Sequence, residues 1–376
     1  MKYPIGIQNF EKIRRDGYVY VDKTPWMWKM ISEGSYYFLS RPRRFGKSLM
    51  VSTLEAFFSG QRELFKGLYA DTVEWDWQQY PIFHLDLNVK KYETKADLEK
   101  VLNRHLELWE KTYESPYGER DLEERFLQVL RLAYEKTGRQ VVILVDEYDK
   151  PLLQVIGNDT LQSEYRSTLK AFYGVLKSCD RYIKFAFLTG VTKFGKISVF
   201  SDLNNLIDIS MLPQFTAVCG ITEKELHTCF DEGIAELADA NSLTKEETYE
   251  RLRRDFDGYR FNEYINEGIY NPFSVLNTLS YKIFKDYWFE TGMTNHIFRQ
   301  MKSQNYSLDM VANEPLFYFQ LHILEKGHDS IVQQLYQSGY LTIKEYDNEF
   351  KTFFLDFPNH IVKEGLENRY MNYIQH

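Results

Sequence analysis

The sequence predicts an α/β protein with a mostly parallel sheet, followed by a helical segment and a C-terminal module of a helix and a hairpin. Short apolar runs alternate with longer amphipathic ones in the first half of the chain, as in repeated β–α units. Residues 141–145 (VVILV) form a continuous apolar run, which is typical of a central strand covered on both faces. After Pro213 the pattern becomes helical.

The elements expected in the first half follow from these patterns. The helices are long enough to cross over between parallel strands, and the first one ends at Ser59-Gly60. Strands are expected at residues 36–39, 82–87, 141–145, 182–188 and 206–209. Helices are expected at residues 47–58, 94–113, 119–136 and about 160–178.

The second half begins with a helix signal, in which Thr222 is the N-cap and Glu225 stands three residues later. Another helix is expected at 243–256, opened by Thr244, and a helical pattern continues over about 270–325. Then come a helix at 331–338 and strands at 340–344 and 350–357 around an Asp347-Asn348 turn, a pattern that resembles a winged helix. We therefore expect domains at residues 1–220, 221–300 (a helical lid) and 301–376 (a winged-helix-like module).

Composition limits the class of protein. The chain has 376 residues, no apolar run near the ~18–20 residues of a membrane-spanning helix, and no apolar signal segment at its start. Its three cysteines show no paired spacing, which is typical of a reducing cytoplasm. A net charge of −8 disfavours bulk binding of nucleic acid.

Residues 40–48 (SRPRRFGKS) lie between the first expected strand and its helix, and they end as a phosphate-binding P-loop ends. Gly46 lets the backbone approach a phosphate, Lys47 reaches the β- and γ-phosphates, and the Ser48 hydroxyl ligates Mg²⁺. Arg41 stands where the pattern has its first glycine, and the alternative interpretation is an ordinary helix N-terminus. The residues predicted to bind the nucleotide are Arg43, Arg44, Phe45, Gly46, Lys47, Ser48 and Leu49.

Asp146 and Glu147 follow the apolar run 141–145 directly, which is the Walker B form. Asp146 would contact Mg²⁺, often through water, and Glu147 would orient or activate the attacking water. Two carboxylates at a strand end are common in themselves. Together with the P-loop, however, they predict a site for ATP and Mg²⁺ at the carboxyl edge of a parallel sheet, where such sheets bind ligands.

Further polar residues extend the predicted site. Thr189, at the end of the strand expected at 182–188, is placed to touch the γ-phosphate or the water, as a sensor-1 residue does; its alternative role is to cap backbone groups of a turn. Arg43 and Arg44 are expected near phosphate; the alternative is that they face solvent or pair with nearby acidic residues. Arg260 is a candidate lid arginine. Asp149 is expected to have a structural role, as a link either to Lys150 or to another loop.

Residues 41–48 (RPRRFGKS), 145–152 (VDEYDKPL) and 188–193 (LTGVTK) resemble the bacterial AAA-ATPase-like family. That family's loop also lacks the first P-loop glycine, so Arg41 is typical of the group. The resemblance covers nearly the whole chain. It extends to 4–10 (PIGIQNF), 20–24 (YVDKT), 256–261 (FDGYRF) and 270–276 (YNPFSVL).

Members of this family usually carry a further domain that resembles PD-(D/E)xK nucleases, which implies a nuclease-like domain or a protein as partner. Residues 300–376 contain no convincing Asp…Glu-x-Lys pattern, so we expect a shortened or naturally short form. Residues 301–376 hold six Lys/Arg and ten Asp/Glu. This acidic balance favours a packing role for the winged-helix-like module over DNA binding.

The favoured function is Mg²⁺-dependent hydrolysis of ATP coupled to lid movement, in a three-layer P-loop domain of the additional-strand class. Glu147, Lys47 and Thr189 are predicted to be catalytic, and Ser48 and Asp146 to hold the metal. One alternative is a regulatory or interaction module in which bound ATP holds a closed conformation with little turnover. Another is the sensor half of a nuclease-like defence or mobile-element protein that engages DNA or a partner. DNA binding by residues 1–60, where ten Lys/Arg stand against five Asp/Glu, would support it.

Overall fold

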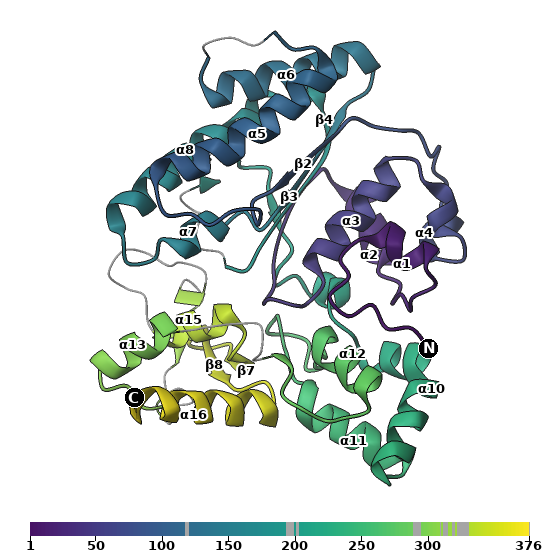
Figure 1. Cartoon of the computed structure of the whole chain (residues 1–376), viewed down its shortest axis with the longest axis vertical. Helices are drawn as coiled ribbons and strands as arrows, with labels where there is room; N and C mark the ends of the chain where they lie inside the picture. Colours follow the sequence, from purple (N-terminus) through teal and green to yellow (C-terminus); the bar gives the residue numbers. More distant parts are fainter. Residues whose placement is uncertain are drawn as a thin grey trace. The chain divides into compact units, whose positions relative to one another are not determined.

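The chain forms two compact units, and neither is a continuous segment. The sheet unit consists of Thr24–Ser40 and Lys47–Ile209, and the C-terminal unit of Met1–Lys23, Arg41–Gly46 and Ser210–His376. Figure 1 labels most of their helices and several of their strands. The computed structural model describes residues 1–116, 120–192, 199–200, 203–288, 295–308, 310, 315–317, 320–321 and 331–375.

The sheet unit contains a five-stranded sheet in the order β2-β3-β4-β1-β5, in which every neighbouring pair is parallel. β3 is buried along its whole length, as its apolar run predicts. β4 lies between β1 and β3, so the strand before the predicted phosphate loop and the strand before Asp146 are not neighbours. The strands are β1 (Tyr36–Ser40), β2 (Ile82–Asp86), β3 (Val141–Asp146), β4 (Ile183–Gly190) and β5 (Ile207–Asp208), and all five were expected.

Helices cover both faces of this sheet, which confirms the predicted α/β class (Figure 1). A capping box of Thr94 and Asp97 opens one of them, and Gly138, with φ 67°, ends another in the left-handed conformation. One face carries α5 (Lys95–Tyr113), α6 (Leu122–Thr137) and α8 (Asp159–Ser178). The other carries α2 (Thr24–Glu33), α3 (Lys47–Phe58) and α4 (Tyr69–Thr72). The short elements are η1 (Arg62–Phe65), α7 (Lys150–Gln154) and η2 (Asp180–Tyr182).

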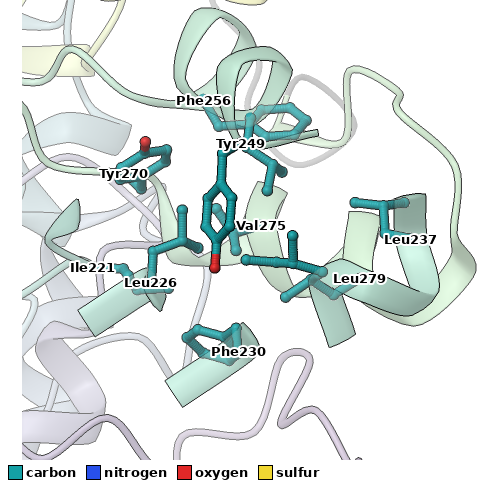
Figure 2. Close-up of a cluster of buried hydrophobic side chains, with 11 residues drawn as sticks. Ile221, Leu226, Phe230, Leu237, Tyr249, Phe256, Tyr270, Val275 and Leu279 are labelled. Carbon is teal, nitrogen blue, oxygen red and sulfur yellow. The ribbon is translucent and has the colours of Figure 1, made fainter. Parts of the chain in front are cut away.

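Three helices of the C-terminal unit pack around one hydrophobic cluster (Figure 2). They are α10 (Glu223–Asn241), α11 (Lys245–Phe256) and α12 (Pro272–Tyr281). The capping box expected at Thr222 and Glu225 is present, and Thr244 opens α11 in the same way. The cluster consists of Ile221, Leu226, Phe230, Ile234, Leu237, Tyr249, Leu252, Phe256, Tyr270, Val275 and Leu279.

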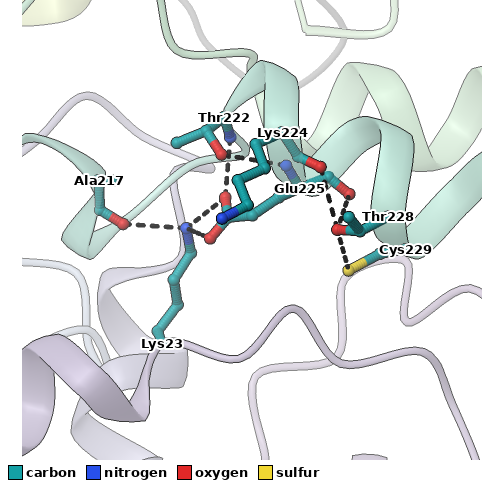
Figure 3. A network of polar contacts seen from close by, with 7 residues as sticks. All are labelled: Lys23, Ala217, Thr222, Lys224, Glu225, Thr228 and Cys229. Atoms are coloured by element: carbon teal, nitrogen blue, oxygen red, sulfur yellow. Dashed lines mark hydrogen bonds and ion pairs between the residues drawn. The ribbon is translucent and has the colours of Figure 1, made fainter.

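The N-terminal segment is held in this unit by a buried lysine (Figure 3). Lys23 Nζ donates hydrogen bonds to both carboxylate oxygens of Glu225 at 2.7 Å and to the carbonyl of Ala217 at 2.9 Å. Burial lowers the pKa of Lys23 despite the attraction of Glu225. Glu225 also accepts from the Thr222 N–H, so one carboxylate caps α10 and fixes the YVDKT segment. This YVDKT segment, residues 20–24, follows helix α1 (Phe10–Arg15) along the chain.

The last part of the C-terminal unit contains an antiparallel sheet in the order β6-β8-β7. The helical pattern expected over 270–325 is wrong at Leu316–Phe317, because this apolar pair forms β6 at the edge of the hairpin. The turn expected around Asp347-Asn348 is present between the two hairpin strands, where Asp347 Oδ1 accepts the N–H groups of Glu349 and Phe350. The other elements are η3 (Pro213–Val218), α13 (Asn295–Ser303), α15 (Ile331–Ser338), β7 (Thr342–Asp347), β8 (Thr352–Asp356) and α16 (His360–Gln375). None of the described helices is long and apolar enough to cross a membrane.

Candidate functional site

The carboxyl ends of four strands meet at one edge of the sheet, because parallel strands run in the same direction. The register places Asp146 beside Asp86, and Ser40 beside Gly190. The residues that follow β1, β3 and β4 therefore start from this common edge. This is where the sequence places the nucleotide.

Asp146 and Thr189, which were predicted separately, are in direct contact. Thr189 Oγ1 donates a hydrogen bond to Asp146 Oδ1 at 2.6 Å, and the Glu147 N–H donates to the same hydroxyl at 3.4 Å. Thr189 is fully buried and Asp146 is 7% exposed. A carboxylate so buried needs hydrogen-bond partners, and Thr189 supplies one. Since none of the described residues donates to Oδ2, that oxygen is the one suited to Mg²⁺, which prefers oxygen ligands.

Glu147 has an unusual backbone. Its φ is 53°, in the left-handed region, which costs a non-glycine residue about 1–2 kcal/mol. Its carboxylate lies 3.9 Å from Lys150 Nζ, and that lysine also donates to the side-chain oxygen of Asn88 beyond β2. Strain of this kind persists where the surroundings fix it, and it clusters at functional sites. Glu147 thus combines a left-handed backbone with an ion pair to Lys150 at the start of α7.

Asp149 joins the loop after β3 to the loop after β4, which is the structural link expected for it. Its buried carboxylate accepts hydrogen bonds from the Val191 N–H, the Thr192 N–H and the Thr192 hydroxyl. Burial raises the pKa of Asp149, although these hydrogen bonds oppose the rise. The Tyr148 hydroxyl donates to the Thr192 carbonyl at 3.1 Å. The loop after β3 and the loop after β4 are therefore held together by buried hydrogen bonds next to Asp146 and Glu147.

The helix α3 begins at Lys47, directly after the loop that follows β1. Lys47 is 4% exposed, and Ser48 is half-buried. All three residues Lys47, Ser48 and Leu49 lie within the α-helix, and the Leu49 carbonyl also accepts from Thr53 Oγ1 at 2.7 Å. The N–H groups of a first turn have no partners within the helix, and together with the helix dipole they favour an anion. Among the predicted phosphate ligands, Lys47, Ser48 and Leu49 thus lie together in this turn.

The rest of the predicted loop makes its contacts inside the C-terminal unit. Arg43 and Arg44 are exposed and Phe45 is buried. The Arg44 guanidinium lies 5.0 Å from the ring centroid of Phe273, and its φ of 69° is left-handed. Gly46 has a φ of 97°, and a Cβ there would meet nothing within 4 Å, so its need for glycine is conformational. That Arg43 and Arg44 neutralise phosphate stays a prediction.

A histidine–carboxylate pair links α3 to β2. His84 Nδ1 lies 3.0 Å from Glu55 Oε2. Burial by itself would lower the pKa of His84, but the hydrogen bond to Glu55 and the carboxylates of Asp146 and Asp86 raise it above its ordinary value. The positive form of His84 is therefore favoured in the folded protein.

This pair makes stability depend on pH. A raised pKa in the folded state means that the stabilisation is complete below the unfolded value of about 6.5 and is lost as pH rises through the folded value. Both side chains are partly exposed, so we expect Glu55→Gln to lower the melting temperature by only about 1–3 °C at pH 6. Thermal unfolding at pH 6 to 9 should show this difference shrinking as pH rises; a constant difference would contradict the assignment.

Similarity to known proteins identifies the family to which this chain and its sheet edge belong. Residues 4–200 match the AAA-ATPase-like family, which is described as "Predicted AAA-ATPase". The chain belongs to the AAA-ATPase-like family. The match spans Lys47, Ser48, Asp146, Glu147 and Thr189. A protein of Azotobacter chroococcum mcd 1, named "Uncharacterized protein in vnfD 5'region", is 36% identical over 373 residues, which cover 97% of this chain and 69% of that protein.

In this AAA-ATPase-like protein, two contacts at the edge escaped the sequence analysis. The ion pair between Glu147 and Lys150 had a signal, because three residues separate them in the DEYDK segment just after a buried strand. The contact of His84 with Glu55 had none, since it joins a strand to a helix 29 residues earlier. Thr189 was predicted, but its contact with Asp146 depends on the register between β3 and β4.

Proposed function

We propose that this AAA-ATPase-like protein binds ATP with Mg²⁺ and hydrolyses it by attack of water on the γ-phosphate. The output would be a conformational change. The observation that carries the proposal is the buried hydrogen bond between Thr189 and Asp146, next to Glu147, at the edge where β1 also ends. The place of β4 between β1 and β3 supports the additional-strand class of P-loop ATPases. Membership of the family adds support for nucleotide binding.

Each residue would have a distinct task. Lys47 and the backbone N–H groups from Arg43 to Leu49 would hold the phosphates, because a buried ammonium and a helix N-terminus both attract anions. Ser48 and Asp146 offer hydroxyl and carboxylate oxygens, the donor type that Mg²⁺ takes. Bound Mg²⁺ would neutralise negative charge on the phosphate oxygens. Glu147 would orient the attacking water and accept its proton.

Thr189 would act through Asp146 as a positioning residue, because its hydroxyl is buried against that carboxylate. This differs from direct contact with the γ-phosphate, the role that the sequence suggested. The hydrogen bond would fix the rotamer of Asp146 and leave Oδ2 available to Mg²⁺. Such support of a metal ligand is worth about 10–100-fold in affinity or activity.

The Thr189→Val variant tests this role. The shape of the side chain is kept and the donor is lost, so we expect the Mg²⁺ concentration that gives half-maximal turnover to rise by about 10-fold or more. ATP binding measured without Mg²⁺ should not change. Thr192→Val is the matched control, because it removes a hydroxyl that serves Asp149 instead. Equal Mg²⁺ dependence in wild type and Thr189→Val would rule out the positioning role.

The main alternative is a nucleotide-binding regulatory module with little turnover. It is favoured by Arg41 in place of the first loop glycine, because the side chain is buried in the C-terminal unit rather than at a phosphate. In that case bound ATP would hold the protein in one conformation and would dissociate without being hydrolysed. Steady-state turnover of purified protein with ATP and Mg²⁺, measured beside calorimetric binding, separates the two: binding without turnover favours the module, and no binding overturns both.

We also propose the division into a nucleotide domain at 1–220, a helical lid at 221–300 and a winged-helix-like module at 301–376. The hydrophobic cluster of α10, α11 and α12 supports the lid, and the elements α15, β7, β8 and α16 support the last module. The excess of Asp and Glu in the last module favours packing or a protein partner over DNA. A nuclease-like domain remains the proposed recipient of the conformational change.

A further inference from the structure

Each of the five residues from Arg41 to Phe45 contacts a later segment of the C-terminal unit. Pro42 lies against Gly339, where an added Cβ would come within 2.6 Å of the proline ring. The Arg43 carbonyl accepts from Trp288 Nε1 at 3.5 Å, and Arg44 lies over Phe273. Residues 41–45 of the predicted phosphate loop are therefore each held by contacts within the C-terminal unit.

Arg41 is buried in this unit through contacts of its guanidinium. It is 2% exposed, and its guanidinium donates to the carbonyls of Ser210 at 2.6 Å and Phe215 at 3.3 Å. The guanidinium carbon also lies 4.0 Å from the ring centroid of Phe261. A planar guanidinium can stack and donate at the same time, which a lysine cannot do. The arginine at the first-glycine position thus anchors the start of the loop.

Phe45 anchors the other end of the loop on the same aromatic side chain, Phe261. Its ring centroid lies 4.8 Å from that of Tyr259 and 5.5 Å from that of Phe261, both edge-on. Its carbonyl accepts the Gly220 N–H at 3.0 Å. Both ends of the loop therefore rest on Phe261.

The residue between these two aromatics contacts the hairpin instead. The Arg260 N–H donates to Thr342 Oγ1 at 2.7 Å, and the same hydroxyl donates to the Arg260 carbonyl at 2.9 Å. The Arg260 guanidinium donates to the Lys344 carbonyl at 3.1 Å. Side chains alternate along an extended segment, so Tyr259 and Phe261 serve the loop while Arg260 serves β7.

We propose that residues 259–261, the relay segment, couple the conformation of the phosphate loop to the β7–β8 hairpin. The coupling rests on the proposed function, because a bound phosphate is what would reshape the loop. Arg260 is then a positioning residue of the hairpin rather than a lid arginine. Close packing supports such coupling, since packed side chains shift between discrete arrangements rather than deform freely.

Amide hydrogen exchange with ATP and Mg²⁺ tests the coupling. In wild type, saturating nucleotide should change exchange in β7 and β8 by about threefold or more, a small local shift in opening. Phe261→Leu should still bind nucleotide but lose the hairpin response. Phe256→Leu, a buried phenylalanine of the α11 cluster, should keep it. Nucleotide binding without a hairpin response in wild type, or a full response in Phe261→Leu, would overturn the relay.

Thr342→Val provides a second variant if Phe261→Leu does not fold. It keeps the shape of the side chain and removes the two hydrogen bonds to Arg260, so binding should persist while the hairpin response falls. Thr352→Val on β8 is its matched control, with a buried hydroxyl in the same hairpin. A hairpin response as large in Thr342→Val as in Thr352→Val would count against the relay.

A comparison of variants without nucleotide tests the relay segment independently of the proposed function. Gly46→Ala strains the loop through its positive φ alone, because an added Cβ meets no atom within 4 Å. We expect it to raise exchange in the relay segment and β7 by about threefold or more. Gly157→Ala, at φ 92° in the sheet unit and equally open, should not. If wild type binds no nucleotide, the proposed function fails, and this comparison alone upholds or overturns the relay.

Discussion

Replacing Lys47 by alanine is expected to weaken binding of ATP and Mg²⁺ by about 10- to 100-fold, since a buried, charge-assisted contact to phosphate is worth about 1.5–3 kcal/mol. Lys47 is 4% exposed at the first residue of α3, where its ammonium would act together with the N–H groups of the helix start. The measurement is isothermal calorimetry with a slowly hydrolysed ATP analogue.

Two further variants make the Lys47 result specific. Lys47→Met keeps most of the aliphatic stem, so it separates loss of charge from loss of packing. Lys29→Ala removes a lysine of the same unit that pairs with Glu33 on the surface, and it should leave affinity unchanged. If Lys47→Met folds and binds as wild type does, Lys47 is not a phosphate ligand and the P-loop assignment is wrong.

The second large effect is expected at Glu147. Glu147→Gln keeps the size of the side chain and its capacity to hydrogen-bond, and glutamine meets the same left-handed backbone as glutamate. ATP binding should survive because Lys47, Ser48 and Asp146 are untouched. Turnover should fall by a factor of about 10²–10⁴, the usual worth of a positioned general base. Phosphate release under saturating ATP measures this.

The control for Glu147 is Glu107→Gln, an exposed carboxylate on α5 in the same unit, which should turn over ATP at the wild-type rate. An unchanged rate in Glu147→Gln, with measurable wild-type turnover, would remove Glu147 from the mechanism. Wild type that binds ATP without turnover would instead favour the regulatory module.

Local patterns predicted many helices and strands in both units. The apolar run of β3 and the helix ends at Thr222 and Thr244 depend on residues close in sequence, so they could be read directly. β6 could not, because Leu316–Phe317 becomes a strand only through pairing with β8.

The candidate site was predictable in composition but not in its contacts. Strand ends identified Asp146, Glu147 and Thr189, yet the hydrogen bond between Asp146 and Thr189 depends on a strand order that the sequence does not display. The role of Arg41 was further out of reach. Its partner Ser210 lies 169 residues later, and an arginine in a phosphate loop looks like a phosphate ligand.

The discontinuous course of the chain also affects the order of assembly during synthesis. The backbone passes between the two units at residues 23/24, 40/41, 46/47 and 209/210, so no single cut separates them. The supports of the phosphate loop, Ser210, Phe215 and Phe261, leave the ribosome long after the loop itself. Contacts between residues so distant in sequence carry a loop-closure cost and form late in folding. A nascent chain that ends near residue 209 would therefore contain the Lys47 and Asp146 segments but lack the supports that shape the loop between β1 and α3.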